Sequence, residues 1–394
     1  MKIQLGMVYT LFLINLSAQD YLEFSSTLSK LQYGDSATRE QIWNQLKSSK
    51  RIPFVSHDSV AFLFRGNART VAWMGDFNAW GYDKNYNVQG TRCGNDLWVL
   101  KLSFPIDARL DYKIYLNGVE WLLDPNNPNQ QWSGVGGGSP NSELRMPAWK
   151  EDDVLLKSSE IGGNITDDVL LFSNILGYQV MYKVYTPHRY ESLSDLPILY
   201  VTDGYEYLHP KMGNMVAVLD NLIAGKKIKP ILVIFVDHRE PVNRANNRRM
   251  RELTMNEHYM TFFIDELIPH VEKDLKADKV PASRGIMGAN VGGLNAAYFA
   301  FTRPDVFGIS GIQSPSFYSA PKIYKVCDTP ESPRIKVYMS SGVLNDASPS
   351  TRKMKAIMEN NACVYNYKEV NEGHSWGNWR NLIDDLLIYF FAPQ

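Results

Sequence analysis

The chain has 394 residues, of which 44% are hydrophobic and 21% charged, and its formal net charge is -1. This composition is typical of a soluble globular protein, and the length suits two domains better than one. The near-zero net charge excludes the broad basic surfaces by which proteins bind nucleic acid or anionic membranes. Three cysteines at wide spacing predict neither a disulfide framework nor a zinc site. A pairing of Cys327 with Cys363 and a set of free thiols, including Cys93, both stay open.

The N-terminus has the pattern of a secretory signal peptide over residues 1–18. Met1 and Lys2 give a basic start, an apolar run follows to about residue 16, and Ser17-Ala18 precede a polar stretch. A buried N-terminal helix is the alternative. The pattern predicts a secreted or periplasmic protein, and no later segment is apolar enough to span a bilayer.

Residues 19–54 predict a short helical segment. Apolar side chains recur at helical intervals from Tyr21 to Leu31, and a second amphipathic stretch opens at Ser36 in the manner of a capping box. Pro53 ends this stretch.

Over residues 55–132 the hydrophobic period changes to two, which predicts a small β-sandwich. The expected strands are 60–64, 70–74, 98–102 and 110–115. Gly75-Asp-Phe-Asn-Ala-Trp80, Tyr112-Lys-Ile-Tyr115 and Asp124-Pro-Asn126 resemble the family 48 carbohydrate-binding modules. The resemblance implies an immunoglobulin-like domain. Its aromatic residues either bind a glycan or only build the core and dock onto the next domain.

Residues 133–150 begin with a glycine-rich run and predict a linker, and residues 151–394 predict an α/β domain. Strands alternate with helices in this part, which indicates a mostly parallel sheet covered on both faces. The first two expected strands form an antiparallel hairpin, and the strands are 164–172, 178–185, 196–201, 230–236, 306–312, 335–340 and 364–370. The expected helices are a long one at 258–275, one at 350–360 and a closing one at 379–391.

The most informative stretch is Arg284 to Tyr298, an apolar strand, a tight turn and a helix. Gly288-Ala-Asn-Val-Gly292 matches the G-x-S-x-G frame of the nucleophile elbow of α/β-hydrolases, except that Asn290 replaces serine. An amide has no hydroxyl that a histidine can activate for attack. Asparagine tolerates the positive φ of an elbow, so the fold is expected to survive the replacement.

Two further residues follow the elbow in the order used by hydrolases, nucleophile, acid, histidine. Asp346 follows the strand that ends near residue 340, where the triad acid belongs. His374 follows the last strand on a glycine-bearing loop beside Trp376 and Trp379. We therefore predict Asn290, Asp346 and His374 as the catalytic positions, with exposed or structural roles as the alternatives for the last two.

An oxyanion hole needs two backbone N–H groups. Val291, at the start of the elbow helix, is expected to supply one, and Gly204 or Tyr205 the other. A basic run of Arg239, Arg248, Arg249 and Arg251 precedes the long helix and is usually a solvated face, but Arg251 with Glu252 is a candidate pair for a substrate cleft.

Several of these motifs together resemble the esterase D superfamily, in particular enterochelin esterases and family 1 carbohydrate esterases. The resemblance is carried by Asp203-Gly204, Asp237-His-Arg239, Arg251-Glu-Leu253, the elbow, and Gly373-His-Ser-Trp376. It implies an α/β-hydrolase fold and hydrolysis of carboxylic esters without metal or cofactor. We also predict substrate-binding roles for Asp203, Arg251, Glu252, Trp376 and Trp379.

The expected function is thus an exported esterase for feruloyl or acetyl esters of plant polysaccharide, impaired by Asn290. A siderophore esterase and a non-catalytic protein that binds a glycan or ester are the alternatives. The expected partner is an ester-bearing carbohydrate or a phenolic small molecule, with no nucleic acid and no membrane, and the oligomeric state stays open.

Overall fold

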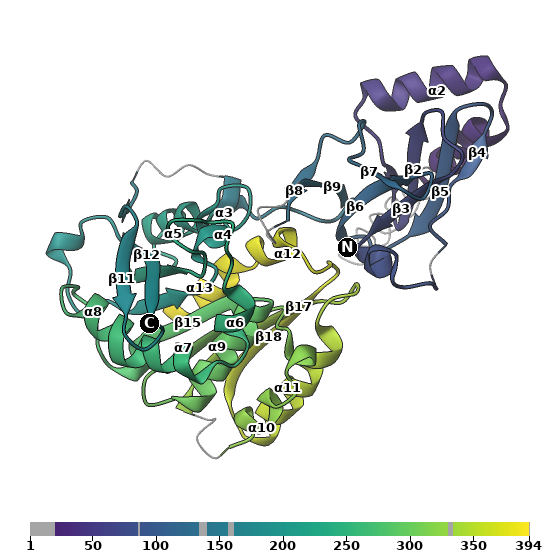
Figure 1. The fold of residues 1–394 in the computed structure, drawn as a ribbon. Coiled ribbons are helices and arrows are strands. Elements are labelled where there is room, and N and C mark those ends of the chain that lie inside the picture. The colour runs from purple at the N-terminus through teal and green to yellow at the C-terminus, as the bar shows by residue number, and fades with distance from the viewer. Residues whose placement is uncertain (1–19, 86, 134–139, 157–160, 330–333, 394) are drawn as a thin grey trace, which may run out of the picture. The chain divides into compact units, whose positions relative to one another are not determined.

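A computed structural model describes residues 20–85, 87–133, 140–156, 161–329 and 334–393. The predicted signal peptide and most of the glycine-rich run lie outside the described residues. The described chain forms two compact units (Figure 1). Unit 1 comprises residues 20–132, 140–150 and 371–373, and unit 2 comprises residue 133 and residues 151–370 and 374–393.

Unit 1 begins with the predicted helices. Residues 20–33 are helical, and α2 (Ser36–Ser48) follows with Asp35 as its N-cap, whose carboxylate accepts from the N–H of Thr38 at 2.7 Å. Apolar side chains of both helices are buried together with side chains of the first sheet, among them Phe24, Trp43, Phe54 and Leu63. The predicted helical segment is confirmed, and it packs on that sheet.

Two antiparallel sheets follow in unit 1. The first has the order β1-β2-β5-β4 and the second β3-β6-β9-β8, with β7 beside β6. Phe62 contacts Trp73 and Tyr112 with ring centroids 6.0 and 5.0 Å apart, so the two sheets share aromatic contacts. All four predicted strands are confirmed; the strands are β1 (Phe54–Ser56), β2 (Ser59–Arg65), β3 (Val71–Gly75), β4 (Thr91–Cys93), β5 (Leu97–Ser103), β6 (Arg109–Leu116), β7 (Glu120–Leu122), β8 (Gln130–Trp132) and β9 (Pro140–Arg145).

Strand β9 corrects the linker expected over residues 133–150, because residues 140–145 pair with β6 and β8. The strand was not predicted because its buried side chains are largely polar. Asn141 donates to Asp111 at 3.0 Å, and Glu143 accepts from Arg109 at 2.6 Å. Arg109 is fully buried and also pairs with Asp111 at 2.5 Å. Buried charges of this kind require such partners.

Unit 2 is built on one sheet of order β10-β12-β14-β13-β15-β16-β17-β18, with β11 also paired to β12. Strands β13 to β18 are mutually parallel, and β10, β11 and β12 form the antiparallel edge with the predicted hairpin. The strands are β10 (Asn164–Ile165), β11 (Val169–Ser173), β12 (Tyr178–Thr186), β13 (Ile198–Val201), β14 (Leu232–Asp237), β15 (Arg284–Ala289), β16 (Ile309–Gln313), β17 (Lys336–Gly342) and β18 (Val364–Val370).

Helices cover both faces of this sheet (Figure 1). Tyr259 of α7 and Phe299 of α9 pack in one core cluster with Met354 of α11, whereas α5 and α13 contact each other elsewhere. The expected long helix is confirmed, with a π-helical turn, Phe263–Leu267, between α7 and α8. The helices named here are α5 (Met215–Ala224), α7 (Glu257–Phe262), α8 (Ile268–Glu272), α9 (Val291–Thr302), α11 (Ser348–Asn360) and α13 (Ile383–Phe391).

The three cysteines carry free thiols, and Cys93 and Cys327 are buried. The sequence left open whether Cys327 and Cys363 form a disulfide, and in the structure they do not. Within the described ranges, helices of the length and apolarity needed to cross a bilayer are absent.

A buried ion pair anchors the start of β15. Arg284 donates from Nε and Nη2 to the two carboxylate oxygens of Glu272 at 2.7 and 2.6 Å, and Tyr200 donates to the same carboxylate at 3.1 Å. Glu272 and Arg284 are both buried. The pair fixes α8 to the strand that leads into the elbow.

Replacing Arg284 by Met should lower the free energy of unfolding of unit 2 by about 3–5 kcal/mol, because Glu272 would remain as a buried, unpaired charge. Arg303→Met is the control, since the Arg303–Asp305 pair is largely exposed and such pairs contribute at most about 1 kcal/mol. Chemical denaturation followed by tryptophan fluorescence measures both. Equal effects of the two substitutions would contradict a special role of the buried pair.

Candidate active site

The predicted site residues lie at one edge of the sheet of unit 2. The register pairs Ala289 with Gln313, and Gln313 with Ser340, so β15 and β16 end together and β17 continues to Gly342 beside them. Strand β13 lies between β14 and β15, although β14 follows it in the chain, and ligands of open α/β sheets bind at such reversals of strand order. Asn290 directly follows β15, and Asp203 lies two residues after the end of β13.

The elbow has the predicted backbone. Asn290 has φ 56° and ψ -115°, a conformation that L residues rarely adopt. The two flanking residues, Gly288 and Gly292, have no room for a side chain. A Cβ atom at Gly288 would lie 2.5 Å from the backbone carbon of Gly292, and one at Gly292 would lie 2.7 Å from Thr202 Oγ1. The strand and the helix therefore cross too closely for any other residue at these two positions.

The structure brings the three predicted catalytic positions together. His374 Nδ1 lies 2.6 Å from Asp346 Oδ1, and His374 Nε2 lies 2.5 Å from Asn290 Nδ2. With a neutral imidazole, Nδ1–H donates to the carboxylate, and Nε2 accepts from the Asn290 amide. The amide thus takes the place that a nucleophilic hydroxyl occupies in a serine triad.

Asp346 is held in place by donors on its second oxygen. Ser314 Oγ and the backbone N–H of Gly342 both donate to Asp346 Oδ2 at 2.6 Å. The Asp346 side chain is fully buried, whereas the His374 side chain is 29% exposed. A fixed, buried carboxylate orients the histidine and leaves its ring accessible to a ligand.

Ser316 is a site residue that the sequence analysis missed. Its hydroxyl donates to Asn290 Oδ1 at 2.6 Å, and its backbone N–H donates to the Asn290 carbonyl at 3.0 Å. Ser316 is buried, so both ends of the Asn290 amide have partners inside the protein. The only signal in the sequence was the Ser314-Pro-Ser316 turn that follows β16.

The two tryptophans near His374 form a wall of the site. Trp379 meets the His374 ring edge to face with centroids 5.0 Å apart, and Trp376 lies 5.3 Å from Trp379. Both indoles are buried. Trp376 also contacts Tyr207 at 4.9 Å. Their main contacts are within the protein, so they shape the site more than they offer free surface.

The expected oxyanion donors begin two helices. Val291 is the first residue of α9, and Gly204 and Tyr205 open α4 (Gly204–Leu208). The first N–H groups of a helix have no acceptor within it, so they are available to a ligand. The Tyr205 ring carries the Arg239 guanidinium 3.6 Å above its centroid, and Arg239 pairs with Asp237 at 2.5 Å. The partner of Asp237 is therefore Arg239, which is not one of the predicted catalytic residues.

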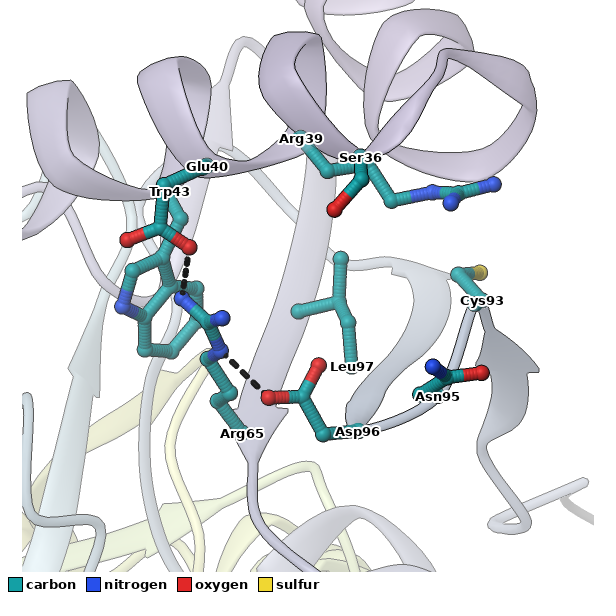
Figure 2. Close-up of a pocket in the computed structure, with 10 residues that line it drawn as sticks. Ser36, Arg39, Glu40, Trp43, Arg65, Cys93, Asn95, Asp96 and Leu97 are labelled. Atoms are coloured by element: carbon teal, nitrogen blue, oxygen red, sulfur yellow. Dashed lines mark hydrogen bonds and ion pairs between the residues drawn. The ribbon is translucent and has the colours of Figure 1, made fainter.

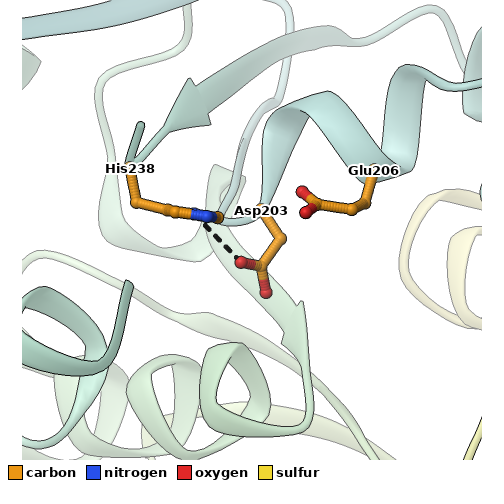
Figure 3. Close-up of side chains that lie close together, drawn as sticks. All are labelled: Asp203, Glu206 and His238. Atoms are coloured by element: carbon orange, nitrogen blue, oxygen red, sulfur yellow. Dashed lines mark ion pairs between the residues drawn. The ribbon is translucent and has the colours of Figure 1, made fainter. Parts of the chain in front are cut away.

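Asp203, expected to bind substrate, is instead buried and fully engaged. Arg249 donates to its two oxygens at 2.6 and 2.7 Å, and His238 lies 3.1 Å away on the opposite side from Glu206 (Figure 3). Burial opposes ionisation, but the Arg249 guanidinium holds the Asp203 pKa below its ordinary value. Burial and the Asp203 charge raise the pKa of Glu206 to about 7.

The ligand atoms of Asp203, Glu206 and His238 lie within 4.8 Å of one another, a spacing that metal sites also use. Arg249 already occupies both oxygens of Asp203 and supplies the positive charge. The donor set therefore fits a guanidinium better than a metal ion. Arg249 belonged to the basic run that the sequence analysis read as a solvated face.

The expected pair of Arg251 and Glu252 is not formed. Glu252 is buried, accepts from Tyr178 at 2.7 Å and pairs with Arg248 at 3.0 Å. Arg251 is exposed and lies 5.1 Å from the Tyr178 ring. Glu252 was expected to contact substrate. Its bond to Tyr178, at the start of β12, instead fixes α6 (Arg249–Leu253) to the β11–β12 hairpin.

Unit 1 holds a separate polar cavity of about 310 Å³ between α2 and the β4–β5 turn (Figure 2). Arg65 bridges Glu40 and Asp96 at 2.6 and 2.7 Å there, so its charge is already balanced. Elsewhere on unit 1, Trp121 lies 4.6 Å from Tyr115 and 6.3 Å from Trp80. Trp121 is 46% exposed, which makes these three rings an aromatic surface.

Two relatives by sequence match much of the chain. An endo-1,4-beta-xylanase/feruloyl esterase of Xylanibacter ruminicola is 24% identical over 309 residues, which are 75% of this chain and 40% of that relative. The chain thus spans less than half of the length of that protein. An uncharacterised Bacillus subtilis protein, YjcH, is 23% identical over 55% of this chain and 93% of its own.

Solved structures share the fold at low identity. The ferric enterobactin esterase of Salmonella typhimurium has a TM-score of 0.71 at 17% identity, covering 84% of this chain and 93% of that one. A structure named ferulic acid esterase has a TM-score of 0.51 at 17% identity, covering 59% and 98%. The mixed α/β fold with its sheets thus matches that of esterases.

A family model described as "Putative esterase" matches residues 173–390, more than half of the chain and nearly all of unit 2. The match includes the elbow, Asp346 and His374. The chain belongs to this esterase family.

Proposed function

We propose that unit 2 is an α/β-hydrolase that recognises carboxylic esters, and that Asn290 reduces hydrolysis by this chain to a trace. The observation that carries the proposal is the contact of Asn290 Nδ2 with His374 Nε2 at 2.5 Å, with Asp346 on the other ring nitrogen. The acid, the base and the elbow are present, and only the attacking oxygen is lacking. Loss of one triad member typically removes several orders of magnitude in rate.

With serine at position 290, the chemistry would run in two steps. The hydroxyl oxygen would bond to the ester carbonyl carbon while His374 Nε2 takes its proton. The N–H groups of Val291 and of Gly204 or Tyr205 would stabilise the oxyanion. The carbon–alkoxide bond then breaks, His374 returns the proton to the leaving alcohol, and water cleaves the acyl-enzyme by the same route.

Feruloyl or acetyl esters of plant polysaccharide are the proposed substrates, and export by the signal peptide would bring the protein to them. The support is the match to the xylanase/feruloyl esterase, which extends over 75% of this chain and thus beyond the family model. A siderophore ester is the second candidate, supported by enterobactin esterase structures that cover 84% of this chain. A binding protein without turnover is the third, supported by the hydrogen-bond partners that both ends of the Asn290 amide have.

Asn290→Ser should convert the chain from a trace to a measurable esterase. The expected result with an activated aryl acetate is a burst of phenol followed by turnover, because the serine hydroxyl would face His374 Nε2. Stopped-flow absorbance measures the burst, and labelling with a fluorophosphonate followed by mass spectrometry measures acylation. The unmodified chain and the Asn290→Ser, His374→Ala double variant are the controls.

A folded Asn290→Ser protein that neither releases phenol nor takes up the fluorophosphonate would decide for the binding protein. Rapid turnover by the unmodified chain, lost in His374→Ala, would instead reveal a nucleophile other than residue 290.

A panel of esters should distinguish a feruloyl esterase from a siderophore esterase. The Asn290→Ser variant is expected to give a higher kcat/KM for methyl ferulate than for a catecholate siderophore, because the relative with the broader sequence match is a feruloyl esterase. Liquid chromatography of the released acids measures both rates. A reversed order would favour the siderophore esterase, as the shared fold alone allows.

A second function, glycan binding, is favoured by the aromatic surface of unit 1. Trp80 and Tyr115 lie in the segments that resemble carbohydrate-binding modules, and the Trp121 ring lies beside both of them. Sugar rings stack on exposed aromatic faces, which supply apolar contact with little loss of side-chain entropy. We propose that this surface holds the polysaccharide that carries the ester.

Trp121→Ala should weaken binding to a soluble polysaccharide such as xylan or glycogen by about tenfold, the effect of about 1.4 kcal/mol. Affinity electrophoresis in gels containing each glycan measures the change. Tyr33→Ala is the control, because Tyr33 is 82% exposed on the N-terminal helix. If the unmodified chain migrates equally with and without every glycan, the aromatic surface has no such role.

A further inference from the structure

One guanidinium joins two segments that border the expected oxyanion donors. Arg249 donates from Nε to Asp203 Oδ1 at 2.6 Å and from Nη2 to Asp203 Oδ2 at 2.7 Å. The same Nη2 donates to the backbone carbonyl of Ala289 at 3.1 Å. Asp203 immediately precedes Gly204, and Ala289 is separated from Val291 only by Asn290. Arg249 therefore contacts the chain on both sides of the expected hole.

The contacts of Asp203 leave its carboxylate little freedom. Its backbone has φ 59° and ψ 38°, a left-handed conformation at the junction of β13 and α4. Such a conformation is strained in a non-glycine residue and persists where the surroundings fix it. A Cβ atom at Gly292 would lie 2.8 Å from Asp203 Oδ2, so the carboxylate packs directly on the first turn of α9.

The charge of Arg249 also matters for an oxyanion. The Asp203 carboxylate is ionised, because Arg249 holds its pKa low in spite of burial. An unbalanced carboxylate so close to the hole would repel a negative oxygen, and the guanidinium cancels this effect. The neighbouring Glu206, whose pKa is raised to about 7 by burial and by Asp203, adds little negative charge in acidic solution.

We infer that Arg249 is a positioning residue that sets the separation between the backbone N–H of Val291 and those of Gly204 and Tyr205 at the start of α4. The inference rests on the proposed ester hydrolysis. Three acceptors, two on Asp203 and one on Ala289, match the planar fork of a guanidinium. A lysine ammonium is a point charge on a flexible stem and does not reproduce this geometry, so Arg249→Lys tests shape at constant charge.

The first arm of the experiment uses the unmodified chain and needs no catalysis. Hydrogen exchange followed by mass spectrometry should show faster exchange in Arg249→Lys at residues 203–208 and 290–294, with the rest of unit 2 unchanged. Arg244→Lys is the matched control, because Arg244 lies on the preceding loop and forms an exposed pair with Asp168. Unchanged exchange in both segments would overturn the inference.

The second arm uses Asn290→Ser as the parent. Adding Arg249→Lys should lower kcat for an aryl acetate by about 10- to 100-fold, since a displacement of about 1 Å costs roughly a hundredfold. KM should change little, because the oxyanion forms only in the transition state. Guanidinium ions should partly restore kcat of Arg249→Ala, whereas sodium chloride at equal ionic strength should not.

The two proposals fail in different ways. If Asn290→Ser alone does not react, the proposed hydrolysis fails, and the exchange arm still decides whether Arg249 holds the two segments. If Asn290→Ser reacts and kcat survives Arg249→Lys, the positioning role is overturned while hydrolysis stands. Faster exchange over all of unit 2 would assign Arg249 to general stability and would also overturn the inference.

Discussion

The close crossing of β15 and α9 is the constraint on which the site depends. Gly288 and Gly292 leave no room for a side chain between strand and helix, and the chain can turn there only with the backbone that Asn290 adopts. That backbone turns the side chain of residue 290 toward His374 and exposes the first N–H groups of α9. The geometry of a hydrolase thus follows from packing, whatever side chain occupies the turn.

The same constraint explains how Asn290 is accommodated. An amide has a donor end and an acceptor end, and the site offers one partner for each: His374 Nε2 accepts and the Ser316 hydroxyl donates. A serine hydroxyl would fill less of this space. Asn290 therefore has a partner at each end of its amide without displacing His374 or Asp346, which remain hydrogen-bonded to each other.

Much of the fold was predictable because hydrophobic period and turn residues reflect local physics. The elbow and the meeting of Asp346 with His374 followed from strand ends that share one edge, whereas the order of the strands in the sheet was not predicted. Strand β9 was missed because its buried side chains are polar and are paired across the sheet. A period-two hydrophobic signal is absent from such a strand.

Side-chain partners were harder to predict than positions. The sequence does not distinguish the three arginines at positions 248, 249 and 251. In the structure, at the start of the short helix α6, Arg249 pairs with Asp203 and Arg248 pairs with Glu252. Arg251 is exposed. Which arginine is buried depends on helix phase and on the partners that other segments bring, and neither is local information. Ser316 was missed for the same reason, because its partner is 26 residues away.

The division of the chain into units has a consequence for how such a protein is inherited and handled. Residues 371–373 belong to unit 1, where Trp149 donates to Glu372 at 3.0 Å, although the chain before and after them belongs to unit 2. Neither unit is therefore encoded by one uninterrupted stretch. A gene rearrangement or an expression plasmid that removes the first 150 residues as a cassette also strips Glu372 of Trp149 and leaves residues 371–373 without the rest of their unit. The two units are thus better exchanged between proteins as one piece than as separable modules.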